Sequence, residues 1–227
     1  MTLSLVGPDE DVAFYARRSR DGAATLVLGC GNGRVALPLA DRSRVLGVDP
    51  SSSMIHAAEE RRAELPSEVA ARVQLVCADL RSLRLSERFA LVLAPQSALS
   101  LMGSLDDLGA LLATVVHHLL PDGAFIFDVN HPRPADAPPT ATDEPRAPPG
   151  AVEPRRPLFA PHLRERKRGR GLGAGIHRLR LRQFEPDELD TALREAGLVA
   201  RERYGSFEGK AYDAEDALQI IVAGPDG

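Results

Sequence analysis

Short apolar runs alternate with segments of helical periodicity along the first 130 residues. Such runs are typical of strands buried on both faces of a parallel sheet. Five are expected to be strands: 24–29, 44–49, 73–79, 89–95 and 124–130. The segments around them predict helices over 9–20, from about residue 33, over 51–65, and from 105 to the Pro-Asp-Gly stop at 121–123. This strand–helix repetition predicts an α/β fold with a doubly wound, Rossmann-like parallel sheet.

The pattern changes after residue 131. Residues 132–161 hold ten of the eighteen prolines and predict an extended, poorly ordered loop. A basic hairpin with a glycine-rich turn is expected next, followed by a helix over 185–197 and strands over 198–204 and 218–224. We therefore divide the chain into three parts: a core over 1–131, a proline-rich loop and basic hairpin cap over 132–183, and closing core elements over 184–227.

Composition favours a soluble cytoplasmic protein. The 227 residues are 44% hydrophobic and 26% charged, with only two cysteines and a net charge of −4. We expect no disulfide, no signal peptide, no membrane span and no metal site. Composition does not indicate the oligomeric state.

Charge is distributed unevenly. Residues 155–182 contain ten Lys or Arg and one acidic residue, Glu165. Three interpretations stay open: a solvated lid, a clamp that holds an anionic acceptor through residues such as Arg180, and an RNA-binding surface. The scarcity of aromatic residues for base stacking makes nucleic acid the least favoured of the three.

Three alternating glycines directly follow the first strand. Gly29, Gly31 and Gly33 lie where a strand-to-helix turn brings backbone close to any ligand at the carboxyl edge of the sheet. Asp49 ends the second strand, where a carboxylate can accept hydrogen bonds from both ribose hydroxyls. Asp79 ends the third and could accept from an adenine amino group. These features predict a nucleoside site.

Several motifs together resemble the class I S-adenosylmethionine-dependent methyltransferases. The similar segments are LVLGCGNGRVALPLA, VLGVDPSSSM, VQLVCADLRSL, FALVLAPQSALSLM, LLPDGAFIFDVN and FEPDELDTALREAGLVARERYGSFEG. The resemblance implies a seven-stranded sheet whose last strand is antiparallel and inserted between the fifth and sixth. It also implies that the basic insertion caps the active site.

The resemblance assigns cofactor-binding roles by position. Gly29, Cys30, Gly31, Asn32 and Gly33 would cradle the methionine moiety, with Cys30 as a small filler rather than a nucleophile. The other residues implied to contact the cofactor are Asp49, Pro50, Met54, Asp79, Leu80, Ala94 and Pro95. Candidates for contact with the acceptor are Tyr15, Gln96, Ser97, His131 and Arg180. No general base is evident, and we name no catalytic residue.

Two positions depart from the family pattern: Val27 and Ala90 stand where an acid is usual. The first would weaken cofactor binding, and the second would affect packing. The sequence predicts S-adenosylmethionine-dependent methyl transfer to a small-molecule acceptor, with S-adenosylhomocysteine as product. The alternatives are a non-catalytic regulator that binds the same nucleoside and, less favoured, an RNA methyltransferase.

Overall fold

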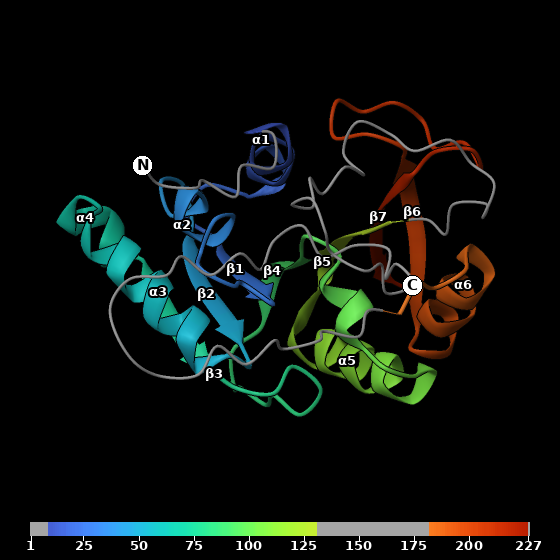
Figure 1. Ribbon diagram of the computed structural model, residues 1–227, viewed down its shortest axis with the longest axis horizontal. Helices are drawn as coiled ribbons and strands as arrows, with labels where there is room; N and C mark the ends of the chain where they lie inside the picture. Colours follow the sequence, from blue (N-terminus) through green and yellow to red (C-terminus); the bar gives the residue numbers. More distant parts are fainter. Residues whose placement is uncertain (1–8, 131–181, 227) are drawn as a thin grey trace, which may run out of the picture.

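A computed structural model describes residues 9–130 and 182–226, which form a seven-stranded sheet in the order β3-β2-β1-β4-β5-β7-β6 (Figure 1). The strands are β1 (Ala24–Leu28), β2 (Arg44–Asp49), β3 (Val73–Cys77), β4 (Phe89–Ala94), β5 (Leu119–Asn130), β6 (Leu198–Tyr204) and β7 (Leu218–Pro225). The pairs among β1 to β5 are parallel, whereas β7 is antiparallel to both β5 and β6. The expected Rossmann-like sheet, with its last strand antiparallel and inserted, is confirmed.

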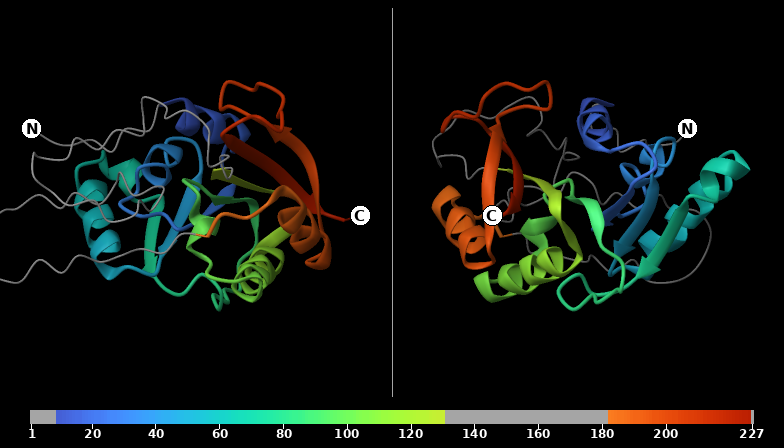
Figure 2. Two further views of the ribbon diagram at one scale, coloured as in Figure 1. Left: turned by 45° about the vertical axis from the view of Figure 1, so that its right-hand side comes forward. Right: turned by 180° about the vertical axis from the view of Figure 1, so that it is seen from behind.

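Helices pack on both faces of the sheet (Figure 2). One face carries α5 (Leu105–His118) and α6 (Pro186–Glu195), which lie side by side. The other carries α1 (Asp9–Arg18), α2 (Ala36–Leu39) and α3 (Ser52–Ala63), with the short α4 (Ser67–Ala70) after α3. Successive residues of β1 contribute to the cores on opposite faces of the sheet. Leu26 and Leu28 lie in the cluster with α5 and α6, and Val27 lies in the cluster with α1 and α2.

Capping groups start three helices where the sequence predicts. The Ser51 hydroxyl accepts from the Met54 amide at 3.4 Å at the start of α3. The Ser104 hydroxyl accepts from the Asp107 amide at 3.1 Å at the start of α5. A capping box between Glu185 and Glu188 opens α6.

Two boundaries differ from the expected ones by more than two residues. The helix expected from about residue 33 is only α2, because the glycine loop continues to residue 35 and Pro38 has no amide to donate. The fifth strand begins at Leu119 rather than 124, because Leu119 pairs with Phe89 of β4 before an irregularity shifts the register. The short helix α4 and the 3-10 helix η1 (Ala98–Leu101) are not expected from the sequence.

The proline-rich loop lies outside the described residues, and so does the basic hairpin except for its last two residues. The Arg182 amide donates to the Ser100 carbonyl at 2.8 Å, and its guanidinium donates to Glu188 at 2.8 Å. None of the described helices is long and apolar enough to cross a membrane. Across 9–130 and 182–226, no group of three or more ligand side chains could hold a metal ion.

Candidate functional site

The glycine loop leaves β1 at the carboxyl edge of the sheet. Gly29, Gly31 and Gly33 have φ angles of +73°, +54° and +81°, in the region that side chains rarely adopt. A Cβ on Gly29 would lie 3.0 Å from Ala98 Cβ, and one on Gly33 would lie 2.8 Å from Leu37. A Cβ on Gly31 would meet nothing within 4 Å. Packing therefore explains two of the glycines, while Gly31 leaves its backbone open beside free space.

Asp49 joins the end of β2 to this loop. Its carboxylate accepts from the Gly31 amide at 2.9 Å through Oδ2 and from the Ser51 amide at 2.9 Å through Oδ1. The residue is only 8% exposed. A carboxylate has about four lone-pair positions, so these two bonds leave acceptor capacity for a ligand. Asp49 can thus hold the loop and bind ligand hydroxyls at once.

Asp79 lies just beyond β3, on the same edge of the sheet. The Arg81 amide and Nε donate to its Oδ1 at 2.9 and 3.0 Å. Arg81 also donates to Asp107 at the start of α5 at 2.6 Å. Hydrogen bonds from Arg81 lower the pKa of Asp79 to about 2. Its side chain is nearly half exposed, so Asp79 presents a carboxylate that is charged at neutral pH at this edge of the sheet.

Cys30 is buried in the loop. It packs against β2, where a Cβ on Gly47 would lie 3.0 Å from Cys30 Sγ. Burial, together with the neighbouring Asp49, raises the pKa of its thiol to about 12. A thiol with that pKa is a poor nucleophile at neutral pH, which agrees with the expected role.

The remaining predicted cofactor residues lie around this edge. The Asn32 carbonyl and side-chain oxygen accept from Arg61 at 3.1 and 3.3 Å. Met54 is partly buried in the first turn of α3, and Pro50 is exposed before it. The others are buried: Leu80, Ala94 and Pro95. Val27, one of the two departures from the family pattern, is completely buried in the core beneath α1 and α2.

Two predicted acceptor residues form a left-handed turn after β4. Gln96 and Ser97 have φ angles of +57° and +55°, a conformation that costs non-glycine residues about 1–3 kcal/mol each. The Gln96 amide donates to Asp128 Oδ1 at 2.7 Å, and the Ser97 amide donates to Oδ2 at 2.9 Å. Hydrogen bonds to a charged group contribute about 1.5–3 kcal/mol each, enough to offset the strain.

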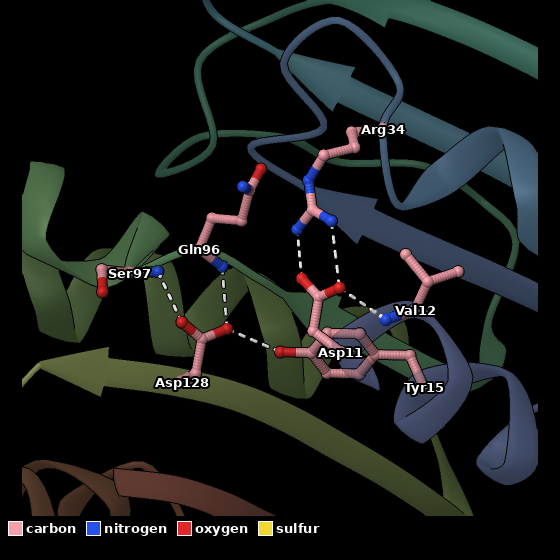
Figure 3. Close-up of polar contacts among 7 residues, drawn as sticks. All are labelled: Asp11, Val12, Tyr15, Arg34, Gln96, Ser97 and Asp128. Carbon is pink, nitrogen blue, oxygen red and sulfur yellow. Dashed lines mark hydrogen bonds and ion pairs between the residues drawn. The ribbon is translucent and has the colours of Figure 1, made fainter. Parts of the chain in front are cut away.

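The other predicted acceptor residues differ in placement. Tyr15 of α1 is completely buried, and its hydroxyl donates to Asp128 at 2.6 Å (Figure 3). Burial and the neighbouring Asp128 raise its pKa well above the usual value. Tyr15 therefore exposes no atom to an acceptor in this arrangement. His131 and Arg180 lie outside the described residues.

Three residues of this polar cluster are not among those expected from the sequence: Asp11, Arg34 and Asp128. Arg34 forms a two-pronged ion pair with Asp11 of α1 (Figure 3). With its side-chain oxygen toward Arg34, Gln96 accepts from Nε and a terminal nitrogen at 3.1 Å. Burial raises the pKa of Asp128, opposed by its hydrogen bonds. The available signal was a single acid, Asp128, within the apolar run AFIFDVN.

Comparison with known proteins identifies the domain that carries this edge. Residues 26–123 match the family model described as a methyltransferase domain. Residues 26–123 are a methyltransferase domain. That segment contains the glycine loop, both acids and the left-handed turn, so the expected resemblance to the class I S-adenosylmethionine-dependent methyltransferases is confirmed for this part of the chain.

Individual proteins similar to this chain are also named as methyltransferases. A cypemycin N-terminal methyltransferase from Streptomyces sp is 30% identical over 135 residues, which are 58% of this chain and 53% of that protein. The chain thus spans about half the length of that curated relative. The CcbJ methyltransferase from Streptomyces caelestis superposes with a TM-score of 0.74 at 24% identity, covering 97% of this chain and 91% of that one. The glycopeptide N-methyltransferase MtfA, solved with S-adenosylmethionine, gives 0.68 at 23% identity, covering 98% and 96%. These structures confirm the fold.

Proposed function

We propose that the protein transfers the methyl group of S-adenosylmethionine to an amine nitrogen of a small molecule or short peptide, with release of S-adenosylhomocysteine and of a proton from the methylated nitrogen to solvent. The observation that carries the proposal is the open backbone at Gly31 beside the Asp49 carboxylate, at the carboxyl edge of a methyltransferase domain. A ligand moiety can approach a bare glycine there while its hydroxyls bind the neighbouring acid.

The same edge has a place for each part of the cofactor. Asp49 would accept from the ribose hydroxyls, and Asp79 from the adenine amino group. Leu80 and Met54 would flank the adenine, and the loop around Gly31 would hold the methionine end. The fit rests on two hydrogen-bond acceptors, Asp49 at the end of β2 and Asp79 just beyond β3. These two strands pair up to Asp49 and Cys77, so both carboxylates lie at the same edge of the sheet.

When bound, S-adenosylmethionine would supply a methyl group on an already activated sulfonium, so alignment of donor and acceptor by the protein could provide most of the catalysis. The left-handed turn at Gln96 and Ser97 lies where β4 reaches the same edge, and we assign it to the acceptor side. An amine acceptor is supported by two of the similar proteins, which their names describe as an N-terminal and an N-methyltransferase. The hypothesis of an anionic acceptor depends on Arg180, which lies outside the described residues. Arg182, two residues later, forms an ion pair with Glu188 and so gives this hypothesis no support.

Calorimetry with S-adenosylhomocysteine tests the cofactor site. Replacing Asp49 by Asn keeps one acceptor oxygen but removes the charge, so affinity should fall by about 1.5–3 kcal/mol, at least about tenfold. Asp21→Asn is the matched control, because Asp21 pairs with Arg42 on the exposed amino edge of the sheet. An unchanged dissociation constant in folded Asp49→Asn would overturn the cofactor assignment.

Transfer of labelled methyl groups tests the reaction. The panel comprises tripeptides with free amino termini, the same peptides N-acetylated, and a structured RNA. We expect label in free peptides and none in acetylated ones. Binding of S-adenosylhomocysteine without transfer to any acceptor would favour the non-catalytic regulator. Label in RNA alone would overturn the small-acceptor assignment.

A further inference from the structure

The turn after β4 is held by a residue of another strand. Asp128, near the end of β5, binds two consecutive backbone amides, those of Gln96 and Ser97, with its two carboxylate oxygens. Two residues further along β5, the Asn130 side chain donates to the Ser97 hydroxyl at 2.9 Å. Asp128 and Asn130 share one face of the strand, since side chains alternate with a period of two. The left-handed turn is thus clamped from β5.

Helix α1 also contacts this clamp. Tyr15 donates its hydroxyl to the same Asp128 oxygen that binds the Gln96 amide. Asp11, one turn earlier in α1, pairs with Arg34, which follows the last glycine of the loop. Arg34 in turn faces the Gln96 side chain (Figure 3). One polar network therefore links the glycine loop, the turn and α1.

Stability alone does not account for Asp128. The residue is 4% exposed and lies among the apolar residues of β5. An apolar side chain usually stabilises a core at least as well as a buried charge does. Strained backbone held by surrounding structure clusters at functional sites. The strained residues here are those at the carboxyl end of β4, where donor and acceptor would meet.

We propose that Asp128 is a positioning residue for methyl transfer, which keeps the Gln96–Ser97 turn in its left-handed conformation so that the acceptor is aligned with the methyl donor. This inference rests on the proposed function. Tyr15 supports Asp128 by fixing one carboxylate oxygen from α1. Because neither side chain reaches Asp49 or Asp79 by a hydrogen bond, their removal should affect turnover rather than cofactor affinity.

A double-mutant cycle tests the clamp. The assay uses the panel tripeptide that is methylated fastest. Asp128→Asn loses one of the two amide acceptors, and we expect kcat to fall by about tenfold to a hundredfold, since small misplacements cost that much. The dissociation constant of S-adenosylhomocysteine should stay within about threefold. Glycine accepts positive φ at little cost, so in a Gln96→Gly, Ser97→Gly background the same change should cost less than about threefold.

Two results would overturn the proposal: an unchanged kcat in Asp128→Asn, or an equal fold-loss in both backgrounds. If Asp128→Asn does not fold, Tyr15→Phe replaces it. That variant should lower kcat several-fold at unchanged cofactor affinity, and the glycine background should again reduce the loss. An unchanged kcat in Tyr15→Phe, or a loss that persists in the glycine background, contradicts the clamp.

If no panel compound is methylated, the proposed function fails and the clamp is judged by crystallography. Crystals of wild type and of the folded variant with S-adenosylhomocysteine give the φ angles of Gln96 and Ser97. We expect left-handed values in the wild type and a changed turn in the variant. A turn that stays left-handed after the carboxylate bonds are lost would overturn the proposal independently of activity.

Discussion

Alanine substitutions at Gly31 and at Gly22 can be compared to distinguish the cost of backbone strain from the loss of ligand contact. Both have positive φ, +54° and +74°, and a Cβ on either would meet nothing within 4 Å. Alanine at either position should therefore cost about 1–2 kcal/mol of stability, from backbone strain alone. Gly31 lies in the loop held by Asp49, whereas Gly22 precedes β1 at the opposite edge, where its amide donates to the Arg42 carbonyl.

The two substitutions should differ in ligand binding. The new methyl of Gly31→Ala occupies the open space that we assign to the cofactor, so the affinity for S-adenosylhomocysteine should fall at least about tenfold, or 1.4 kcal/mol. Gly22→Ala should bind normally. Urea unfolding gives the stability cost of each variant, and calorimetry gives each dissociation constant. Equal affinities in the two folded variants would refute the assignment of that space to the cofactor.

Two further predictions concern groups buried in the structure. His118 Nε2 accepts from the Leu85 amide and its Nδ1 bonds to the Thr114 carbonyl, and burial lowers its pKa. Its contribution to stability should be complete above the unfolded pKa of about 6.5 and lost as pH falls below it. The free energy of unfolding, measured with urea, should therefore fall more between pH 7 and 5.5 in wild type than in His118→Gln. Equal decreases in the two proteins would contradict this prediction. A thiol reagent at pH 8 should modify exposed Cys77 and spare Cys30, whose thiol pKa is about 12, until the protein unfolds; rapid double labelling of folded protein would argue against a buried Cys30.

Much of the fold was predictable because its signals are local. Apolar runs bounded by turn residues marked the strands, and the serines at 51 and 104 marked helix starts that the structure confirms by capping bonds. The order of strands came from the family resemblance. Boundaries that depend on pairing with a distant strand were missed: Leu119 belongs to β5 because Phe89 pairs with it, although the local pattern continues the helix.

The glycine loop and the acids after the second and third strands could be located from the sequence, because their spacing along the chain places them at one edge of a parallel sheet. The left-handed turn at Gln96 and Ser97 could not, since neither residue favours that backbone conformation. Only the folded chain brings Tyr15 and Asp128, which are 113 residues apart, into contact and aims that carboxylate at the turn. Local residue types determined where a nucleoside can bind, whereas long-range hydrogen bonds decided the conformation of the backbone beside it.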